Sequence, residues 1–310
     1  MDPAFHDARE RFTKPKGPEP PVYQKTKFQR LLARNPYAQA LATPIRRCPA
    51  TGVHLPKHFL QGFRFMSHPE TGRPYWVPQG LEKKQSQTTA MEGTTDNGER
   101  DTAPATAEGE LAANARTPLG PTGYFLSSQK LLKGFLTPGS PYFGREKSLL
   151  QMNRSSAERL RSVLRKVVWR DGMDAFILDL TRRRIVEGLV EFSELVEKAG
   201  RKYLIKCESW DDAKQYKHRG CLLYLGSSDS AQDAVGAPPA QLSTMTIPDV
   251  RFGGKLAVHD LAVLLGDEHL NRLRQESPLL RDGSLFLLGR QRTLDLQLLL
   301  WKLQGYIALR

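Results

Sequence analysis

The chain has 310 residues, of which 39% are hydrophobic, so it is long enough to bury a sizeable core. It carries 46 Lys and Arg against 33 Asp and Glu, a net charge of +13, and 28 of the cations are arginine. No apolar run reaches the ~20 residues of a membrane span, and the three scattered cysteines, Cys48, Cys207 and Cys221, cannot form a disulfide framework. The composition therefore argues against membrane-spanning helices and disulfide-stapled scaffolds. The positive charge favours nucleic acid as the partner, with an anionic membrane surface as the alternative.

Composition divides the chain into four regions. Residues 1–35 are a polar, basic arm, with a short helix expected around residues 25–34. Residues 36–81 are rich in proline, aromatic and basic side chains, and residues 1–81 together carry a charge of +8. Residues 82–120 carry −3 and lack aromatics, which predicts an acidic flexible tether or insertion. Residues 121–310, at +8, show a globular pattern. We therefore predict one α+β or α/β C-terminal domain with a long, irregular, basic N-terminal extension.

The segment 36–81 is unusual because it is both interrupted and aromatic. Its 46 residues contain seven prolines and one acid, Glu70. Proline removes a backbone N–H and restrains the residue before it, so we expect no long helix or regular strand. The aromatic content exceeds that of a disordered arm, which predicts an irregular chain that becomes ordered on a large anionic partner.

The globular region alternates between helical and strand-like patterns. A basic amphipathic helix is expected at 156–170, a strand at 175–180 and a helix at 183–199. Further strands are expected at 203–207, 221–225, 242–247 and 284–288. A helix is expected to begin at Trp210-Asp211-Asp212. A broken pair of helices is expected at 259–265 and 267–275, and an apolar helix at 294–307.

Two basic features point to phosphate as a partner, the first more strongly than the second. The 156–170 helix has a single acid, Glu158, and Arg161 and Arg165 lie one turn apart, so both can reach one phosphate track. The run Arg182-Arg183-Arg184 is placed just before a helix, where positive charge opposes the macrodipole unless an anion is present.

Motifs for catalysis and metal binding are missing from the sequence. It contains no P-loop, dinucleotide fingerprint, zinc-protease or nucleophile-elbow signature. The residues Cys48, His54, His58 and His68 match no standard zinc spacing. We therefore expect no enzyme activity, no cofactor, no metal and no small-molecule substrate.

The run from Asn35 to Cys48, continuing through Leu55–Phe63 to Pro74–Pro78, resembles the N-terminal part of fungal mitochondrial ribosomal proteins. Phe286–Arg292 and the final residues up to Tyr306 are similar to the same family. The resemblance implies a fungal-specific component of the mitochondrial small subunit, located in the matrix, with a structural role on ribosomal RNA.

We therefore expect a non-catalytic subunit that binds mitochondrial rRNA and other mitochondrial ribosomal proteins. Two alternatives are a free-standing mitochondrial RNA-binding factor for translation or processing, and an organellar enzyme with a dispersed site. A ligand-shaped polar cavity in the 121–310 domain, holding carboxylates or histidines with perturbed pKa values, would favour the enzyme. The expected aromatic anchors, by stacking or by packing on protein, are Phe59, Tyr75 and Trp76. The expected phosphate contacts are Arg30, Arg34, Arg46, Arg47, Lys57, Arg64, Arg73, Arg154, Arg159, Arg161, Arg165, Lys166 and Arg170.

Overall fold

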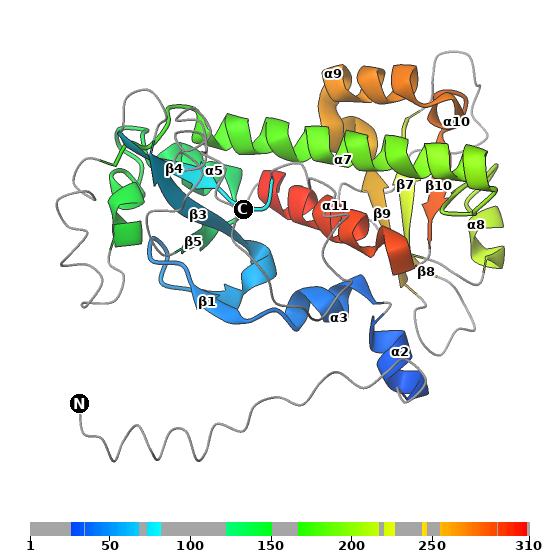
Figure 1. The fold of residues 1–310 in the computed structure, drawn as a ribbon, viewed down its shortest axis with the longest axis horizontal. Helices are drawn as coiled ribbons and strands as arrows, with labels where there is room; N and C mark the ends of the chain where they lie inside the picture. Colours follow the sequence, from blue (N-terminus) through cyan, green and yellow to red (C-terminus); the bar gives the residue numbers. More distant parts are fainter. Residues whose placement is uncertain are drawn as a thin grey trace, which may run out of the picture.

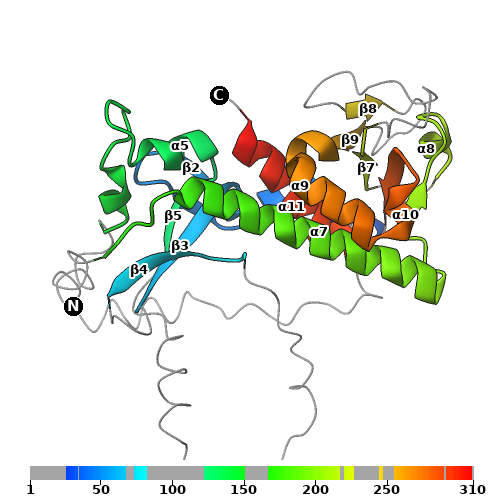
Figure 2. The same cartoon turned by 90° about the horizontal axis from the view of Figure 1, so that it is seen from above.

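The computed structural model describes residues 26–33, 35–67, 73–81, 122–150, 167–216, 220–226, 244–246, 255–289 and 291–308. The described residues form a mixed α+β structure, which confirms the predicted class at that level. A long helix, α7 (Met173–Ala199), runs past both of the larger sheets, and α11 (Leu294–Ile307) lies beside it (Figures 1 and 2).

A three-stranded antiparallel sheet occupies one end of α7. Its order is β4 (Pro74–Pro78), β3 (Leu60–Ser67), β5 (Gly123–Leu126), followed in sequence by α5 (Gln129–Gly134) and a 3-10 helix, η3 (Arg145–Leu150). Before it come α2 (Lys27–Ala33), α3 (Pro36–Leu41), the ribbon of β1 (Ile45–Arg47) and β2 (His54–Pro56), and the 3-10 helix η2 (Lys57–Phe59).

The prediction that residues 36–81 are irregular was wrong for the described part of this segment. The prolines lie at element boundaries: Pro36 opens α3, Pro56 ends β2, and Pro74 and Pro78 are the first and last residues of the edge strand β4. A proline at such a position costs no ladder hydrogen bond. The prediction that segment 36–81 is separate from the globular region 121–310 was also wrong, because β3 of the former pairs with β5 of the latter across the tether.

A five-stranded mixed sheet occupies the other end of α7, in the order β6-β10-β7-β9-β8 with β7 and β9 parallel. Its strands are β6 (Leu204–Lys206), β7 (Cys221–Tyr224), β8 (Thr244–Thr246), β9 (Lys255–Asp260) and β10 (Leu285–Leu288). The helices around it are α8 (Asp212–Gln215), α9 (Leu261–Glu276) and α10 (Pro278–Arg281), and η4 (Gln291–Thr293) leads into α11. Four of these strands, the helix after Trp210 and the final helix match their predictions, whereas β9 was missed.

The helix α7 is longer than predicted. The run 175–180 was expected to be a strand, but Met173, Ile177, Thr181 and Ile185 are buried at i, i+4 spacing, so it forms the first turns of the helix. A short apolar run does not distinguish a strand from a buried helix, and here tertiary packing decides. The predicted helix 156–170 lies largely outside the described residues. Its described end, 167–170, is not helical, because Val168 bridges to Tyr75 of β4.

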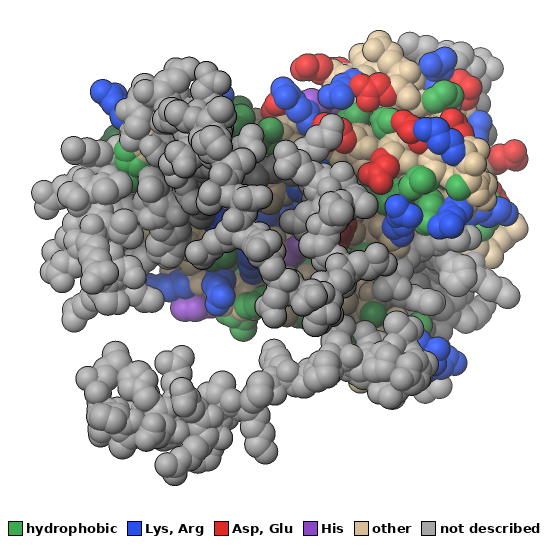
Figure 3. Space-filling view, in the orientation of Figure 1, with side chains coloured by type: hydrophobic (Ala, Val, Ile, Leu, Met, Phe, Trp, Pro, Cys, Tyr) green, Lys and Arg blue, Asp and Glu red, His purple; other side chains and the backbone are tan. Residues whose placement is uncertain are grey.

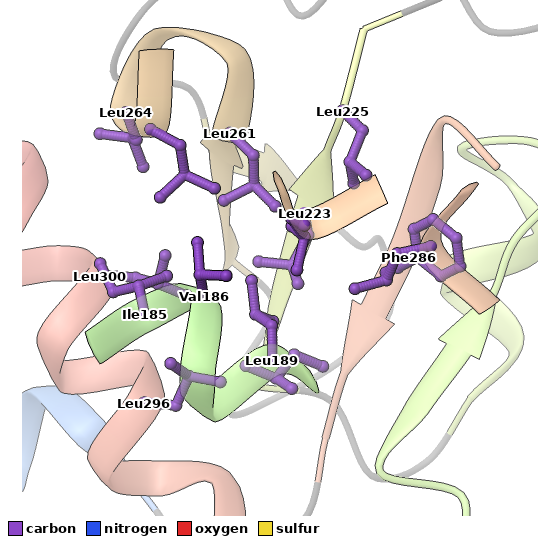
Figure 4. Packing of buried hydrophobic residues seen from close by; sticks show 14 of the residues in the cluster. Ile185, Val186, Leu189, Leu223, Leu225, Leu261, Leu264, Phe286, Leu296 and Leu300 are labelled. Atoms are coloured by element: carbon purple, nitrogen blue, oxygen red, sulfur yellow. The ribbon is translucent and has the colours of Figure 1, made fainter. Parts of the chain in front are cut away.

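Two apolar clusters share α7 and α11. Met173 and Ile177 of α7 pack with Phe63, Trp76 and other residues of the three-stranded sheet. Further along, Ile185, Val186 and Leu189 pack against Leu223 and Phe286 of the five-stranded sheet, together with Leu296 and Leu300 of α11 (Figure 4). The opposite face of that sheet is covered separately by residues including Ala213 of α8. The two ends of the molecule are therefore joined by shared helices.

Candidate nucleic-acid interface

The β1–β2 ribbon presents two arginines on its surface. Arg46 pairs with Leu55 and Arg47 with His54, and all three residues of β1 are exposed. The turn is closed by a hydrogen bond from the Cys48 N–H to the Val53 carbonyl (2.9 Å), and Gly52 adopts φ +77°, which glycine tolerates best. Between Asn35 and Ser67 the chain contains no Asp or Glu. Basic and histidine side chains accordingly gather over β1 in Figure 3, whereas acids concentrate around α9.

The ribbon is fixed to the free edge of β5. The Leu126 N–H donates to the Sγ of Cys48 at 3.3 Å, and Cys48 and Ala50 are buried in the same cluster as Phe63 and Phe125. The arginines of β1 are therefore held on a packed support, not on a loose arm.

One face of the three-stranded sheet continues this surface. Alternate residues of a strand point to opposite faces, and the register pairs Arg64 with Val77, Met66 with Tyr75 and Gly62 with Tyr124. Arg64 is exposed and donates from Nε to the Thr122 hydroxyl at 3.2 Å. This face thus offers one arginine and two partly exposed tyrosines.

Lys57 joins the ribbon to the sheet. Its backbone N–H donates to the Pro44 carbonyl at 2.9 Å, and its Nζ lies 5.9 Å from the ring centre of Tyr124. The side chain is exposed, so the cation stands over an aromatic face and beside the ribbon. We name Arg46, Arg47, Lys57, Arg64, Tyr75 and Tyr124 the basic surface.

The predicted aromatic anchors occupy different environments. Tyr75 lies on the outer face of β4, but its neighbour Trp76 is 5% exposed and packs in the chain's own core. Phe59 packs edge-on against Trp301 of α11, with ring centres 5.2 Å apart. Trp76 therefore anchors the sheet to its own protein and is not accessible for stacking on a base.

The remaining predicted contacts are scattered or undescribed. Arg73 is exposed at the start of β4, Arg30 belongs to α2, and Arg170 lies over the Phe176 ring at 3.9 Å. Six of the predicted contacts lie outside the described residues: Arg34, Arg154, Arg159, Arg161, Arg165 and Lys166.

The run Arg182–Arg184 lies in the middle of α7, so the predicted placement before a helix was wrong. Arg182 donates to the Leu264 carbonyl at 2.8 Å, Arg183 pairs with Asp179 at 2.9 Å, and Arg184 donates to the Gly80 carbonyl. Each arginine therefore has a partner within the protein, and the macrodipole argument for an anion no longer applies.

A groove of about 920 Å³ runs between α7 and α11, and its lining includes His58, Gly80, Arg184 and Lys302. Lys302 donates from Nζ to the Oε1 of Gln61 at 3.1 Å. Desolvation, together with the charges of Lys57 and Arg184, lowers the pKa of Lys302 to about 8. Desolvation, followed by the charge of Lys302, lowers the pKa of His58 to about 4. The groove is lined by both polar and apolar side chains and holds a histidine whose pKa is lowered. Such a histidine is one of the features that would favour the enzyme alternative, but His58 precedes the region 121–310 in which that alternative places the cavity.

The sequence did not point to Lys302 or Tyr124 as functional residues, and it pointed to Arg184 only as part of the run Arg182–Arg184. Lys302 left one signal, since it is the sole cation of an otherwise strongly apolar helix.

The four residues considered as metal ligands from the sequence are not brought together. Cys48 is buried under β5, His54 is exposed on β2, His58 lines the groove, and His68 lies outside the described residues. Within the described ranges, no group of three or more His, Cys, Asp or Glu is placed to hold a metal ion. The helices in the same ranges include none that is long and apolar enough to cross a membrane.

Comparison with known proteins identifies no relative. No family model, no curated protein and no solved structure matches this chain.

Proposed function

We propose that this protein is a structural component of the mitochondrial ribosome, in its small subunit, and that it binds ribosomal RNA through the basic surface. The observation that carries the proposal is the acid-free ribbon with exposed Arg46 and Arg47, fixed beside a sheet face that bears Arg64, Tyr75 and Tyr124. The proposed role is non-catalytic and its location is the mitochondrial matrix.

The chemistry of the basic surface suits RNA. Arginine presents a planar fork of donors that matches phosphate oxygens, and it stacks on bases. Partly exposed tyrosines on a sheet can support unpaired bases, because every base has a π-face. The net charge of +13 favours association with a polyanion at long range. The resemblance to fungal mitochondrial ribosomal proteins supports the ribosome as the source of that RNA.

We also propose that the protein contacts neighbouring ribosomal proteins. Its exposed apolar side chains support this. Phe28 (67% exposed) and Leu31 lie on α2, which buries none of its residues, and Leu41, Ile45 and Val53 are exposed nearby in sequence. Phe28 and Leu31 lie one turn apart on α2, and neighbouring apolar residues exposed on one helix are typical of a protein interface. The Arg46 and Arg47 side chains share β1 with Ile45, so RNA and protein contacts would meet at the ribbon.

Sedimentation tests the proposal directly. Mitochondria expressing the tagged protein are lysed at low salt and fractionated on a sucrose gradient, and the fractions are analysed by mass spectrometry. We expect the protein in the small-subunit peak at a stoichiometry near that of other subunit proteins. Recovery at the top of the gradient would overturn the proposal. Substoichiometric, sequence-selective RNA binding away from ribosomes would instead identify a free-standing factor.

An RNA-binding measurement tests the surface itself. The variant Arg46→Gln/Arg47→Gln should bind a single-stranded RNA about 10-fold more weakly at low salt. The slope of the logarithm of the binding constant against the logarithm of the salt concentration should become less steep by about 1.4, since each phosphate contact to a single strand contributes ~0.7. The control Arg183→Gln/Arg272→Gln removes two exposed, ion-paired arginines from α7 and α9 and should leave the affinity near that of the wild type. Equal losses in both variants would show that net charge acts, not the ribbon.

A further inference from the structure

The lysine in α11 occupies an unusual position. Lys302 follows Trp301 in an apolar helix, is partly exposed, and lines the groove between α7 and α11. Its Nζ donates to the side-chain oxygen of Gln61, on the inner face of β3. An ammonium has three donors, so this single contact leaves capacity for a ligand.

Two other cations act on Lys302 from different elements. Arg184 of α7 lines the same groove, whereas Lys57 of η2 lies over the Tyr124 ring, and both charges disfavour the charged form of Lys302 and so lower its pKa. Gathering like charges around a desolvated ammonium opposes folding unless an anion compensates for them. The arrangement is therefore poorly explained as a device for stability.

His58 adds a polar atom to the same place. Its Nε2 is buried and has no hydrogen-bond partner among the described residues. The ring is stacked on Trp301, with centres 5.5 Å apart, and Tyr37 packs edge-on against the same indole at 4.7 Å. This aromatic packing holds η2 against α11 and so keeps His58 beside Lys302 in the groove. A buried imidazole with an unused nitrogen is able to donate a hydrogen bond to a ligand.

The charged residues of the groove are unevenly distributed along it. The helices α7 and α11 are antiparallel: the Tyr306 hydroxyl donates to the Asp174 carbonyl at 2.9 Å, and Leu296 lies 3.3 Å from the Cβ position of Gly188. Lys302 is therefore level with a part of α7 before Gly188, where Arg184 lies. The acids Glu187, Glu191 and Glu194 follow Arg184 along α7, and the rest of the lining includes Glu276, Asp295 and Arg292. The groove is therefore basic beside Lys302 and of mixed charge beyond it.

We propose that the basic end of this groove is a binding site for a phosphate group, held by Lys302, Arg184 and His58. A phosphate group carries one negative charge as the diester of an RNA backbone and between one and two as a monoester near neutral pH. In both forms it offers several acceptor oxygens to cations that approach from different sides. Gln61 accepts the hydrogen bond from Lys302, whereas its neighbour Gly62 lies on the other face of β3 with Tyr124, so the site and the sheet part of the basic surface lie on opposite faces of β3. The phosphate source is either the backbone of an RNA or a small phosphorylated ligand.

The first arm uses tripolyphosphate, with calorimetry and thermal shift on the full chain against sodium chloride at equal ionic strength. We expect the wild type to bind, Lys302→Met to bind at least 10-fold more weakly, and Lys133→Met, an exposed lysine of α5, to match the wild type. Methionine keeps the unbranched stem, so Lys302→Met should fold, which circular dichroism checks. If it does not fold, Arg184→Gln replaces it, because Arg184 is partly exposed, lines the groove and is not part of the basic surface.

The second arm measures RNA affinity of the same variants with tripolyphosphate as a competitor. Weaker RNA binding by Lys302→Met, together with competition, identifies the RNA backbone as the source. Unchanged RNA binding with lost tripolyphosphate binding identifies a small ligand. The proposal is overturned if Lys302→Met equals the wild type in both arms. A Lys302-dependent site in a protein that does not sediment with ribosomes would leave this site standing and remove only the ribosomal role.

Discussion

At the scale of single residues, neighbours in the sequence have opposite roles. Tyr75 and Trp76 are adjacent in β4, yet Tyr75 faces outward with Arg64 and Trp76 is buried among the core aromatics. Strand geometry imposes this difference, since successive side chains point to opposite faces. A substitution at one position should therefore affect binding, and at the other, folding.

The Tyr75/Trp76 pair provides a matched test. Trp76→Ala should lower the free energy of unfolding by about 3–5 kcal/mol, as truncation of a buried large side chain does. Tyr75→Ala should change it far less and should weaken RNA binding by removing about 1–3 kcal/mol of stacking. Urea unfolding and RNA titration distinguish the two. A stability loss as large in Tyr75→Ala would show that this tyrosine is mainly structural.

A second residue-scale prediction concerns pH. His259 of β9 is buried, and desolvation lowers its pKa to about 4, partly opposed by a hydrogen bond to Gln304. The unfolded histidine has a pKa of about 6.5, so between pH 6.5 and 4 the unfolded state binds more protons and stability falls as the pH is lowered. His58 acts in the same direction.

We expect His259→Gln to reduce this pH dependence, by up to about 3 kcal/mol between pH 7 and 4. The control is His54→Gln, an exposed residue of β2 that should retain the wild-type profile. Unfolding free energies measured at pH 7, 6 and 5 provide the comparison. A profile of His259→Gln that matches the wild type would mean that carboxylates alone set the acid sensitivity.

At the scale of elements, the break in α9 depends on one glycine. Gly266 adopts φ +71° and ψ 169° between the two parts of the helix, and Arg182 donates to the carbonyl of Leu264 just before it. The sequence predicted two helices on either side of this position, and the structure confirms them. A residue with a Cβ is strained in this conformation.

Gly266→Ala should therefore lower the free energy of unfolding by about 1–3 kcal/mol. Gly305→Ala is the matched control: it lies in α11 with open space around its Cβ position, and the change should stabilise by up to about 1 kcal/mol. Thermal unfolding of both variants decides the matter. Stabilisation of both would show that α9 can run straight through residue 266.

At the scale of the whole molecule, α7 and α11 connect the two ends. Residues of α7 belong to both principal clusters, and α11 contributes Leu300 to one and Tyr306 to the other. Shared helices favour a single cooperative unfolding transition over two independent ones.

Cysteine labelling in denaturant tests this cooperativity. Cys48 is buried at the three-stranded sheet and Cys221 in the five-stranded sheet, and neither is in a disulfide. Both thiols should become reactive at the same urea concentration, coincident with the loss of helical circular dichroism. Earlier exposure of Cys48 would show that the N-terminal half unfolds separately.

The sequence alone determined the features that depend on local periodicity and composition. The apolar helix 294–307, the broken pair around Gly266 and most strands of the five-stranded sheet follow from the spacing of apolar residues. The charge distribution and the exposed Arg46 and Arg47 could also be predicted, because no acid lies near them in sequence.

Tertiary structure decided what depends on distant partners. Residues 60–67 and 74–78 form strands because β5, beyond the tether, pairs with β3, and because the prolines fall at strand ends. The run 175–180 is helical because α7 spans both clusters, and only that packing turns Trp76 inward. Lys302, Arg184 and His58 line one groove from three elements far apart in sequence, a juxtaposition that no local pattern encodes. Local spacing fixes the period of an element, whereas contacts between elements fix which face is buried and which charges meet.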